Sequence, residues 1–216
     1  AISVGVPVTD RTAGELLESL APRVRALKVG PSLDPASEMG PLVTREHFAK
    51  VRGYIDLAER EGAKVLVDGR GLEVAGHENG FFLGGTLLDG VRPQMRVYLE
   101  EIFGPVLSMV RAGSFEEALE LPSSHEYGNG VSIFTRNGDV ARNFAQKVDT
   151  GMVGINVPIP VPLSFHTFGG WKSSLFGDMN QHGPEGVRFY TRVKTVTARW
   201  QRGVKPGANF GMPLMK

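Results

Sequence analysis

The sequence predicts an α/β fold in which helices flank a mostly parallel sheet. Segments of strand length alternate with helical segments between residues 106 and 156, and this alternation favours parallel strands joined by right-handed crossovers. Hydrophobic residues make up 41% and charged residues 22% of the 216 residues, which is the balance of an ordinary soluble globular protein. A chain of this length can bury a sizeable core.

The first half of the chain predicts two helices and two strands. The first 30 residues or so are expected to be helical, because leucines and a valine recur at helical spacing after Asp10, which can cap a helix. Pro22 should break or kink this helix. Residues 29–44 are rich in Gly, Pro, Ser and Asp and predict a loop. A second helix is expected between the cap Thr44 and Gly62, and the stretches AKVLVDG and GFFLGGTLLDGV then predict strands.

The second half predicts the alternating part of the fold. VLSMVRA, from Val106, has strand length, and Ser114 with Glu117 forms a capping box for the helix FEEALEL. The strand GVSIFT, the helix NGDVARNFAQKV and the strand GMVGIN follow. A long loop rich in Pro and Gly then leads to GVRFYTRVKTVTARW, whose alternation predicts an edge strand at residues 187–200. Such an edge invites pairing with another chain.

Composition excludes several kinds of site. The sequence has no cysteine, so it holds no disulfide, no thiolate zinc site and no cysteine nucleophile. The five histidines lie far apart without ligand spacing, and no metal site is predicted. A net charge of +1 and the absence of a long apolar run predict neither a nucleic-acid partner nor a membrane one. Without a secretory signal, a cytoplasmic location is expected. Basic residues near the C-terminus are read as a solvated edge rather than a phosphate site.

The stretch EEIFGP, residues 100–105, is the best candidate for a binding site. It places two carboxylates beside a phenyl ring, ahead of a stiff Gly-Pro corner and a buried strand. A carboxylate accepts hydrogen bonds from sugar hydroxyls and an aromatic face stacks on a flat heterocycle, so the pair suits a nucleoside. The alternative, favoured on composition alone, is that Glu100 or Glu101 pairs with a nearby arginine and that Phe103 belongs to the core.

Five motifs in order resemble the aldehyde dehydrogenase superfamily. EEIFGP is similar to its signature turn, MGPLVTREH from Met39 to a loop and helix start, GMVGIN from Gly151 to a strand ending in Asn, and FGGWKSS from Phe168 to a further turn. YTRVKTVTARW resembles the family's last strand. GINVPIPVPL and GWKSSLFGD resemble in particular the CoA-acylating methylmalonate-semialdehyde dehydrogenase subfamily.

The resemblance implies roles for individual residues. Glu101 matches the acid that binds the nicotinamide ribose of NAD, and Phe103 matches the ring that packs against the nicotinamide. Asn156 and Phe168 match positions that line the aldehyde pocket, and Lys50 matches an adenosine-ribose contact. No catalytic residue is expected in this chain, because the family's nucleophilic cysteine would lie just before Ala1.

The resemblance therefore implies a C-terminal fragment, inactive by itself. Residues 1–186 would be part of the catalytic domain, 187–200 an oligomerisation strand and 201–216 a tail. The parent enzyme would oxidise a small semialdehyde with NAD and coenzyme A as a homodimer or homotetramer. Two alternatives remain: a hydrolytic dehydrogenase for another small aldehyde, and a non-catalytic assembly module with the same fold.

Overall fold

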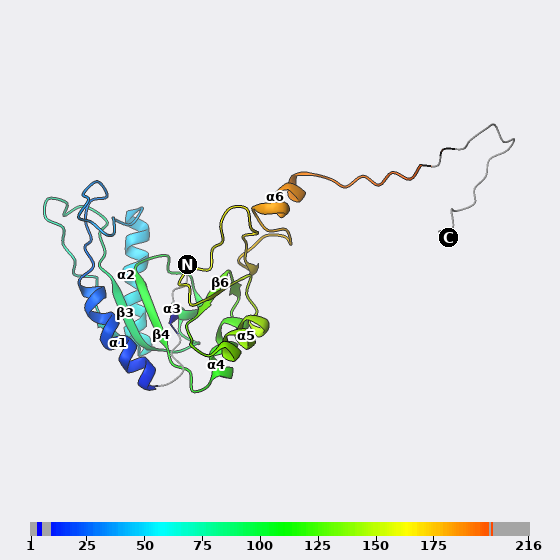
Figure 1. The fold of residues 1–216 in the computed structure, drawn as a ribbon. Helices are drawn as coiled ribbons and strands as arrows, with labels where there is room; N and C mark the ends of the chain where they lie inside the picture. The colour runs from blue at the N-terminus through cyan, green and yellow to red at the C-terminus, as the bar shows by residue number, and fades with distance from the viewer. Residues whose placement is uncertain (1–3, 6–9, 199, 201–216) are drawn as a thin grey trace.

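The computed structural model describes residues 4–5, 10–198 and 200. Two lobes lie side by side, and an extended segment leaves the second lobe (Figure 1). The expected tail at 201–216 lies outside the described residues. In the described part of the chain, no helix is long and apolar enough to cross a membrane.

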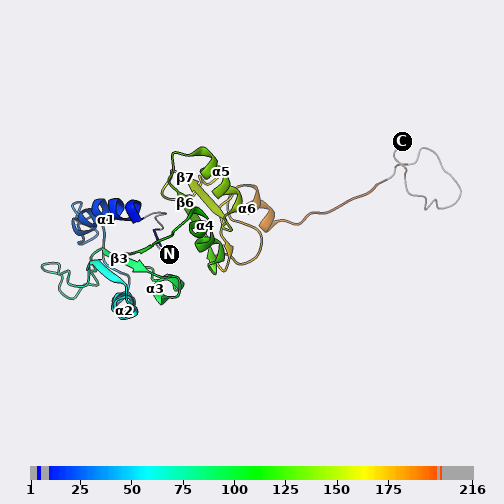
Figure 2. The same cartoon turned by 90° about the horizontal axis from the view of Figure 1, so that it is seen from below.

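The first lobe is a four-stranded sheet between two helices. Its strands are β1 (Val4–Gly5), β2 (Lys64–Val67), β3 (Thr86–Val91) and β4 (Val106–Val110), in the order β1-β4-β3-β2. β1 and β3 pair parallel to β4, and β2 pairs antiparallel to β3. α1 (Asp10–Arg25) and α2 (Arg45–Glu61) cover opposite faces of this sheet (Figure 2). The sequence did not indicate β1, which lies within the region expected to be helical.

Burial on both faces explains the apolar run of β3. Leu87 packs with Leu17 of α1 and Met109 of β4, whereas Leu88 packs with Ile55 of α2 on the other face. Because successive side chains of a strand point to opposite faces, a strand between two helices needs apolar residues at neighbouring positions. The short helix α3 (Arg96–Leu99) then leads from this sheet to the corner at residues 100–105.

Helix ends follow the local signals in the sequence. Thr44 Oγ1 accepts a hydrogen bond from His47 N at 3.1 Å, and α2 ends at Gly62 with φ 97°. Ser114 Oγ accepts a hydrogen bond from Glu117 N at 3.1 Å at the start of α4 (Phe115–Ser124). Pro22 does not break α1, which continues to Arg25. The predicted caps Thr44, Gly62 and Ser114 are thus confirmed.

The second lobe contains two small sheets. β6 (Gly130–Ile133) and β7 (Met152–Ile155) pair parallel around α5 (Gly138–Lys147), while β5 (Tyr127–Gly128) and β8 (Trp171–Lys172) pair antiparallel. The predicted parallel crossover from β6 to β7 is confirmed. The expected continuation from β4 to β6 in one sheet is wrong, because β1 and β3 already occupy both edges of β4.

The predicted strand at residues 187–200 is wrong in its first four residues. These belong to α6 (Gly183–Tyr190), which begins with Pro184 in its first turn and carries an ion pair between Glu185 and Arg188 at 2.6 Å. Residues 191–198 run on from α6 without secondary structure and are exposed (Figure 1). The predicted boundary between 186 and 187 therefore falls inside a helix.

A close backbone approach closes the loop between β2 and β3. Gly84 N donates to Gly69 O at 2.9 Å, and Gly69 N donates to Thr86 Oγ1 at 3.1 Å. A Cβ atom at Gly69 would lie 2.0 Å from Gly84 O, so this contact requires glycine. Residues 70–83 form a loop whose two ends are joined in this way.

Candidate functional site

The corner at residues 100–105 lies against the middle of α2. A Cβ atom at Gly104 would lie 2.7 and 2.8 Å from the two methyl carbons of Val51, so a larger residue would push the corner away from the helix. Pro105 O accepts a hydrogen bond from Thr86 N at 2.8 Å, which joins the corner to the start of β3. The corner is therefore held by packing on one side and by the sheet on the other.

The two acids of the corner have different surroundings. Glu100 accepts hydrogen bonds from Arg96 Nε at 2.6 Å and from the Tyr54 hydroxyl. The guanidinium of Arg96 and then that hydroxyl lower the pKa of the Glu100 carboxyl to about 2. Glu101 is exposed, and its backbone oxygen accepts a hydrogen bond from Lys50 Nζ at 3.5 Å. The internal ion pair considered from the sequence thus involves Glu100.

Phe103 presents its ring to solvent from a left-handed backbone. The residue is 65% exposed and has φ 55°. This conformation costs a non-glycine residue about 1–2 kcal/mol. His47 Nε2 donates a hydrogen bond to Phe103 O at 2.7 Å, which offsets about 0.5–1.5 kcal/mol of that cost. Phe103 is therefore not the core residue of the alternative interpretation.

Sequence reasoning missed His47 as part of this corner. His47 and Lys50 are three residues apart, so they lie on one face of α2, where both reach backbone oxygens of the corner. The imidazole also meets the Phe103 ring edge-on, with 6.4 Å between centroids. The sequence relates His47 only to Lys50, through helical spacing. It gives no sign that His47 contacts the corner, which is more than 50 residues away in the sequence.

Asn156 closes the end of the β6–β7 pair. Its backbone has φ 56°, its Oδ1 accepts from Thr135 N at 2.9 Å, and its Nδ2 donates to Thr135 O at 3.1 Å. The side-chain amide thus extends the strand pairing by one step beyond Ile133 O, which accepts from Asn156 N at 2.8 Å. Its position in an aldehyde pocket stays a prediction.

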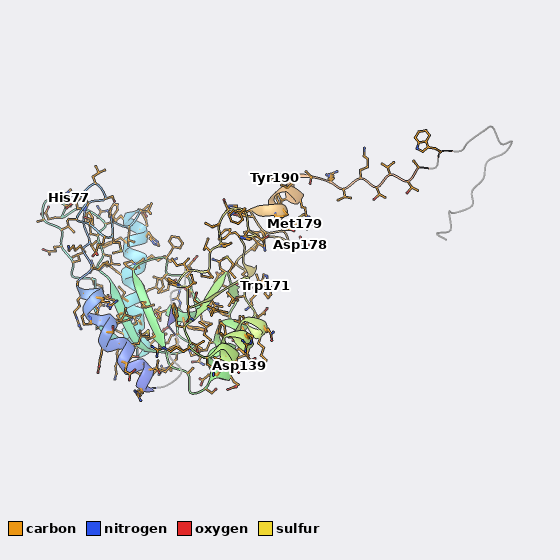
Figure 3. All side chains as sticks on the ribbon, in the orientation of Figure 1. His77, Asp139, Trp171, Asp178, Met179 and Tyr190 are labelled. Carbon is orange, nitrogen blue, oxygen red and sulfur yellow. The ribbon has the colours of Figure 1, made fainter. Side chains whose placement is uncertain are left out.

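Phe168 and Lys172 fix the FGGWKSS turn. Phe168 exchanges two backbone hydrogen bonds with Gln181, of 2.9 and 2.8 Å, and its ring stacks on His182 at 5.5 Å. Lys172 Nζ donates to three backbone oxygens at the end of α4, those of Pro122, Ser123 and His125, at 3.1, 2.6 and 3.1 Å. The turn is thereby attached to α4, with Trp171 on the flank of this lobe (Figure 3).

Backbone strain gathers at these motifs. Among the described residues, four non-glycine residues have a positive φ, namely Phe103, Asn156, Lys172 and His182. The first three lie in EEIFGP, GMVGIN and FGGWKSS. Strained residues persist where their surroundings over-determine them, and they cluster at functional sites. The strained residues therefore lie in the three motifs that resemble the aldehyde dehydrogenase superfamily.

The predicted site residues form two groups. Lys50, Glu101 and Phe103 meet at α2 in the first lobe, whereas Asn156 and Phe168 belong to the second lobe. One surface cavity, of about 400 Å³, lies between residues 28–37 and residues 74–77. A second, of about 290 Å³, lies between residues 90–94 and residues 110–117. Neither cavity is lined by a predicted site residue. In the described part of the chain, no three His, Asp or Glu residues are placed to hold a metal ion.

Comparison with known proteins gives a consistent result. Residues 5–196 match the family model described as the aldehyde dehydrogenase family. The chain is 56% identical over 216 residues to malonate-semialdehyde dehydrogenase of Pseudomonas aeruginosa, covering all of this chain and 44% of that protein. A Sinorhizobium meliloti structure assigned as methylmalonate-semialdehyde dehydrogenase in complex with NAD superposes with a TM-score of 0.91 at 56% identity, covering 94% of this chain and 42% of the other.

A second solved structure agrees. Methylmalonate-semialdehyde dehydrogenase of Oceanimonas doudoroffii superposes with a TM-score of 0.90 at 53% identity, over 93% of this chain and 41% of that one. This chain thus spans less than half the length of these relatives. With the match running from β1 through the segment after α6, the chain belongs to the aldehyde dehydrogenase family.

Proposed function

We propose that this chain is part of an NAD-dependent, CoA-acylating dehydrogenase for malonate or methylmalonate semialdehyde. The observation that carries the proposal is the corner on α2. It offers an exposed acid, Glu101, and an exposed ring, Phe103, two residues apart on the surface of the corner. The substrate assignment rests on the names of relatives more than 50% identical to this chain.

The corner fits a nicotinamide nucleotide. An ionised carboxylate accepts hydrogen bonds from both hydroxyls of a ribose, and Glu101 is accessible for this. The ring of Phe103 gives a flat apolar surface for the nicotinamide. When bound, NAD would supply the hydride acceptor of the oxidation. The acid and the ring of the corner are both exposed, so a nucleotide can reach them.

The chemical steps need groups that this sequence does not contain. Oxidation through a thioester requires a thiolate nucleophile, and this chain has no cysteine. We therefore expect the purified 216-residue chain to form no NADH from semialdehyde, CoA and NAD. In the proposed enzyme, this chain's residues bind the nucleotide and, through Asn156 and Phe168, line the aldehyde site.

A hybrid enzyme tests the proposal. This chain would replace the matching 216 residues of the Pseudomonas aeruginosa malonate-semialdehyde dehydrogenase. We expect NADH formation that requires CoA and yields an acyl-CoA. The variant Glu101→Gln should lower kcat/KM for NAD about 10- to 150-fold, the loss expected for hydrogen bonds to a charged group. Glu73→Gln, a surface change in another loop, is the control and should have no effect.

Each outcome of the hybrid test is informative. Equal activity of the Glu101→Gln and Glu73→Gln hybrids would contradict the nucleotide role of the corner. An active hybrid that releases a free acid without CoA would support the hydrolytic alternative. A folded hybrid without any dehydrogenase activity would favour the assembly module instead.

Residues 191–198 support a proposed role in assembly as a homodimer or homotetramer. They are exposed, without secondary structure, and follow α6, none of whose residues is buried. A strand needs a neighbour for its backbone groups, and a second chain can supply one. Thr195→Pro removes a backbone N–H and should lower the molar mass of the assembly measured by light scattering. Thr195→Ala keeps the N–H and should leave that mass unchanged. Equal masses for the two variants would count against pairing through this segment.

A further inference from the structure

The backbone of Phe103 depends on support from outside its own side chain. Its ring is 65% exposed, so packing of the ring does not hold the left-handed conformation at φ 55°. Gly104, the next residue, is the one that packs against Val51. The peptide oxygen of Phe103 is the group that receives a short hydrogen bond, from His47 Nε2 at 2.7 Å. The Lys50 contact with Glu101 O, at 3.5 Å, is longer and weaker.

His47 is itself fixed by the start of α2. It is the third residue of the helix, and its backbone N–H is bound to the capping Thr44 Oγ1 at 3.1 Å. One turn later, Val51 is fully buried against the corner. Because a carbonyl oxygen only accepts hydrogen bonds, Nε2 of His47 must carry the proton.

We propose that His47 is a positioning residue for the nucleotide site. By binding Phe103 O it keeps Phe103 in the left-handed conformation, and this conformation aims the phenyl ring toward solvent, where the nicotinamide would pack. The inference rests on the proposed function for its last step, but the effect of His47 on the Phe103 backbone is independent of any nucleotide.

The backbone effect can be measured in the 216-residue chain. Labelling with ¹³C-carbonyl phenylalanine and ¹⁵N-glycine selects the four Phe-Gly pairs of the sequence, which begin at residues 103, 168, 176 and 210. In His47→Ala we expect the carbonyl resonance of Phe103 to move upfield while the other three signals stay in place. His47→Gln should restore it, because the glutamine amide offers a donor near the position of Nε2.

His77 provides a matched control. Its ring meets Phe82 edge-on at 6.1 Å and 63°, nearly the geometry of His47 with Phe103 at 6.4 Å and 65°. It lies in the loop at the far side of the first lobe (Figure 3), and in the described part of the chain its ring makes no hydrogen bond to a carbonyl. His77→Ala should leave the Phe103 signal unchanged. An unmoved Phe103 signal in His47→Ala would overturn the positioning role and leave the proposed function standing.

The hybrid enzyme described above tests the consequence for the nucleotide. We expect His47→Ala to raise KM for NAD about three- to tenfold, the change that corresponds to losing one hydrogen bond, with KM for the semialdehyde unchanged. His47→Gln should recover most of the loss. A moved Phe103 signal with an unaltered KM for NAD would also overturn the proposal, because the backbone would then not matter for the site.

Discussion

Replacing Lys172 by methionine should destabilise the chain more than the same exchange at Lys147. The substitution keeps most of the apolar stem and removes the ammonium. All three N–H donors of that ammonium are used by the oxygens of Pro122, Ser123 and His125, and the side chain is only 20% exposed. The substitution leaves these three oxygens at the end of α4 without their donor.

The magnitude follows from the number and burial of these contacts. Removing a hydrogen bond to a charged group costs about 1.5–3 kcal/mol, and the three contacts share one charge, so their losses do not add fully. Attraction to the C-terminal end of α4 contributes about 0.3–1 kcal/mol more. We therefore expect a loss of about 2–4 kcal/mol in the free energy of unfolding. For a chain of this size, that is a fall in Tm of about 5–15 °C.

Urea unfolding followed by tryptophan fluorescence measures this loss. Trp171, the neighbour of Lys172 in β8, is half exposed and should report the loosening of the turn directly. The matched control is Lys147→Met, which removes a cation near the C-terminal end of another helix, α5. Lys147 has no ion pair or side-chain hydrogen bond to another described residue, so its loss should stay near 0.5 kcal/mol. Equal midpoints for the two variants would refute the capping role of Lys172.

Three further predictions concern the other motifs. Gly104→Ala should destabilise the chain by about 1–3 kcal/mol because its Cβ overlaps Val51, and Val51→Ala should relieve part of this loss in a double-mutant cycle of unfolding free energies; additive losses would contradict the overlap. The pKa of Glu100 in the folded chain is lowered to about 2, so its pair with Arg96 should stabilise the fold above pH 4.5. This stability, about 1 kcal/mol for a partly exposed pair, should be lost as the pH falls from 4.5 to 2. In Glu100→Gln, the free energy of unfolding should not show this fall with pH. Asn156→Ala should cost about 1–3 kcal/mol in urea unfolding, since both amide contacts with Thr135 and a residue tolerant of positive φ are lost; an unchanged midpoint would contradict this.

Local signals allowed the sequence to predict the ends of helices correctly. The cap Thr44 and the left-handed Gly62 act within four residues of the helix that they limit, so the printed sequence contains the whole interaction. The same holds for Ser114 at α4. α6 also had a local signal, Pro184 in its first turn, but the alternating threonines that begin at Thr191 led the strand prediction too far back.

Distant pairing could not be predicted in the same way. β4 pairs with β1, about a hundred residues earlier, and with β3. No residue between 106 and 156 indicates that both edges of β4 are already paired. The corner at residues 100–105 shows the same limit within the site. Its type was recognisable, and the pairing of Glu100 with Arg96 is local, at i,i+4 spacing. The hydroxyl of Tyr54 that also binds Glu100 comes from α2, more than 40 residues away.

The loop at residues 70–83, whose two ends are joined by a hydrogen bond, is a suitable place to insert a label into this protein. Gly69 and Gly84 are joined backbone to backbone, and Phe82 and Leu83 are buried, whereas residues 75–80 of the loop are exposed. Chain entropy rises only slowly with loop length, so an epitope or a fluorescent label inserted near residue 78 should be tolerated. Such an insertion would allow the chain to be tracked in cells or immobilised on a sensor surface with the corner on α2 left accessible.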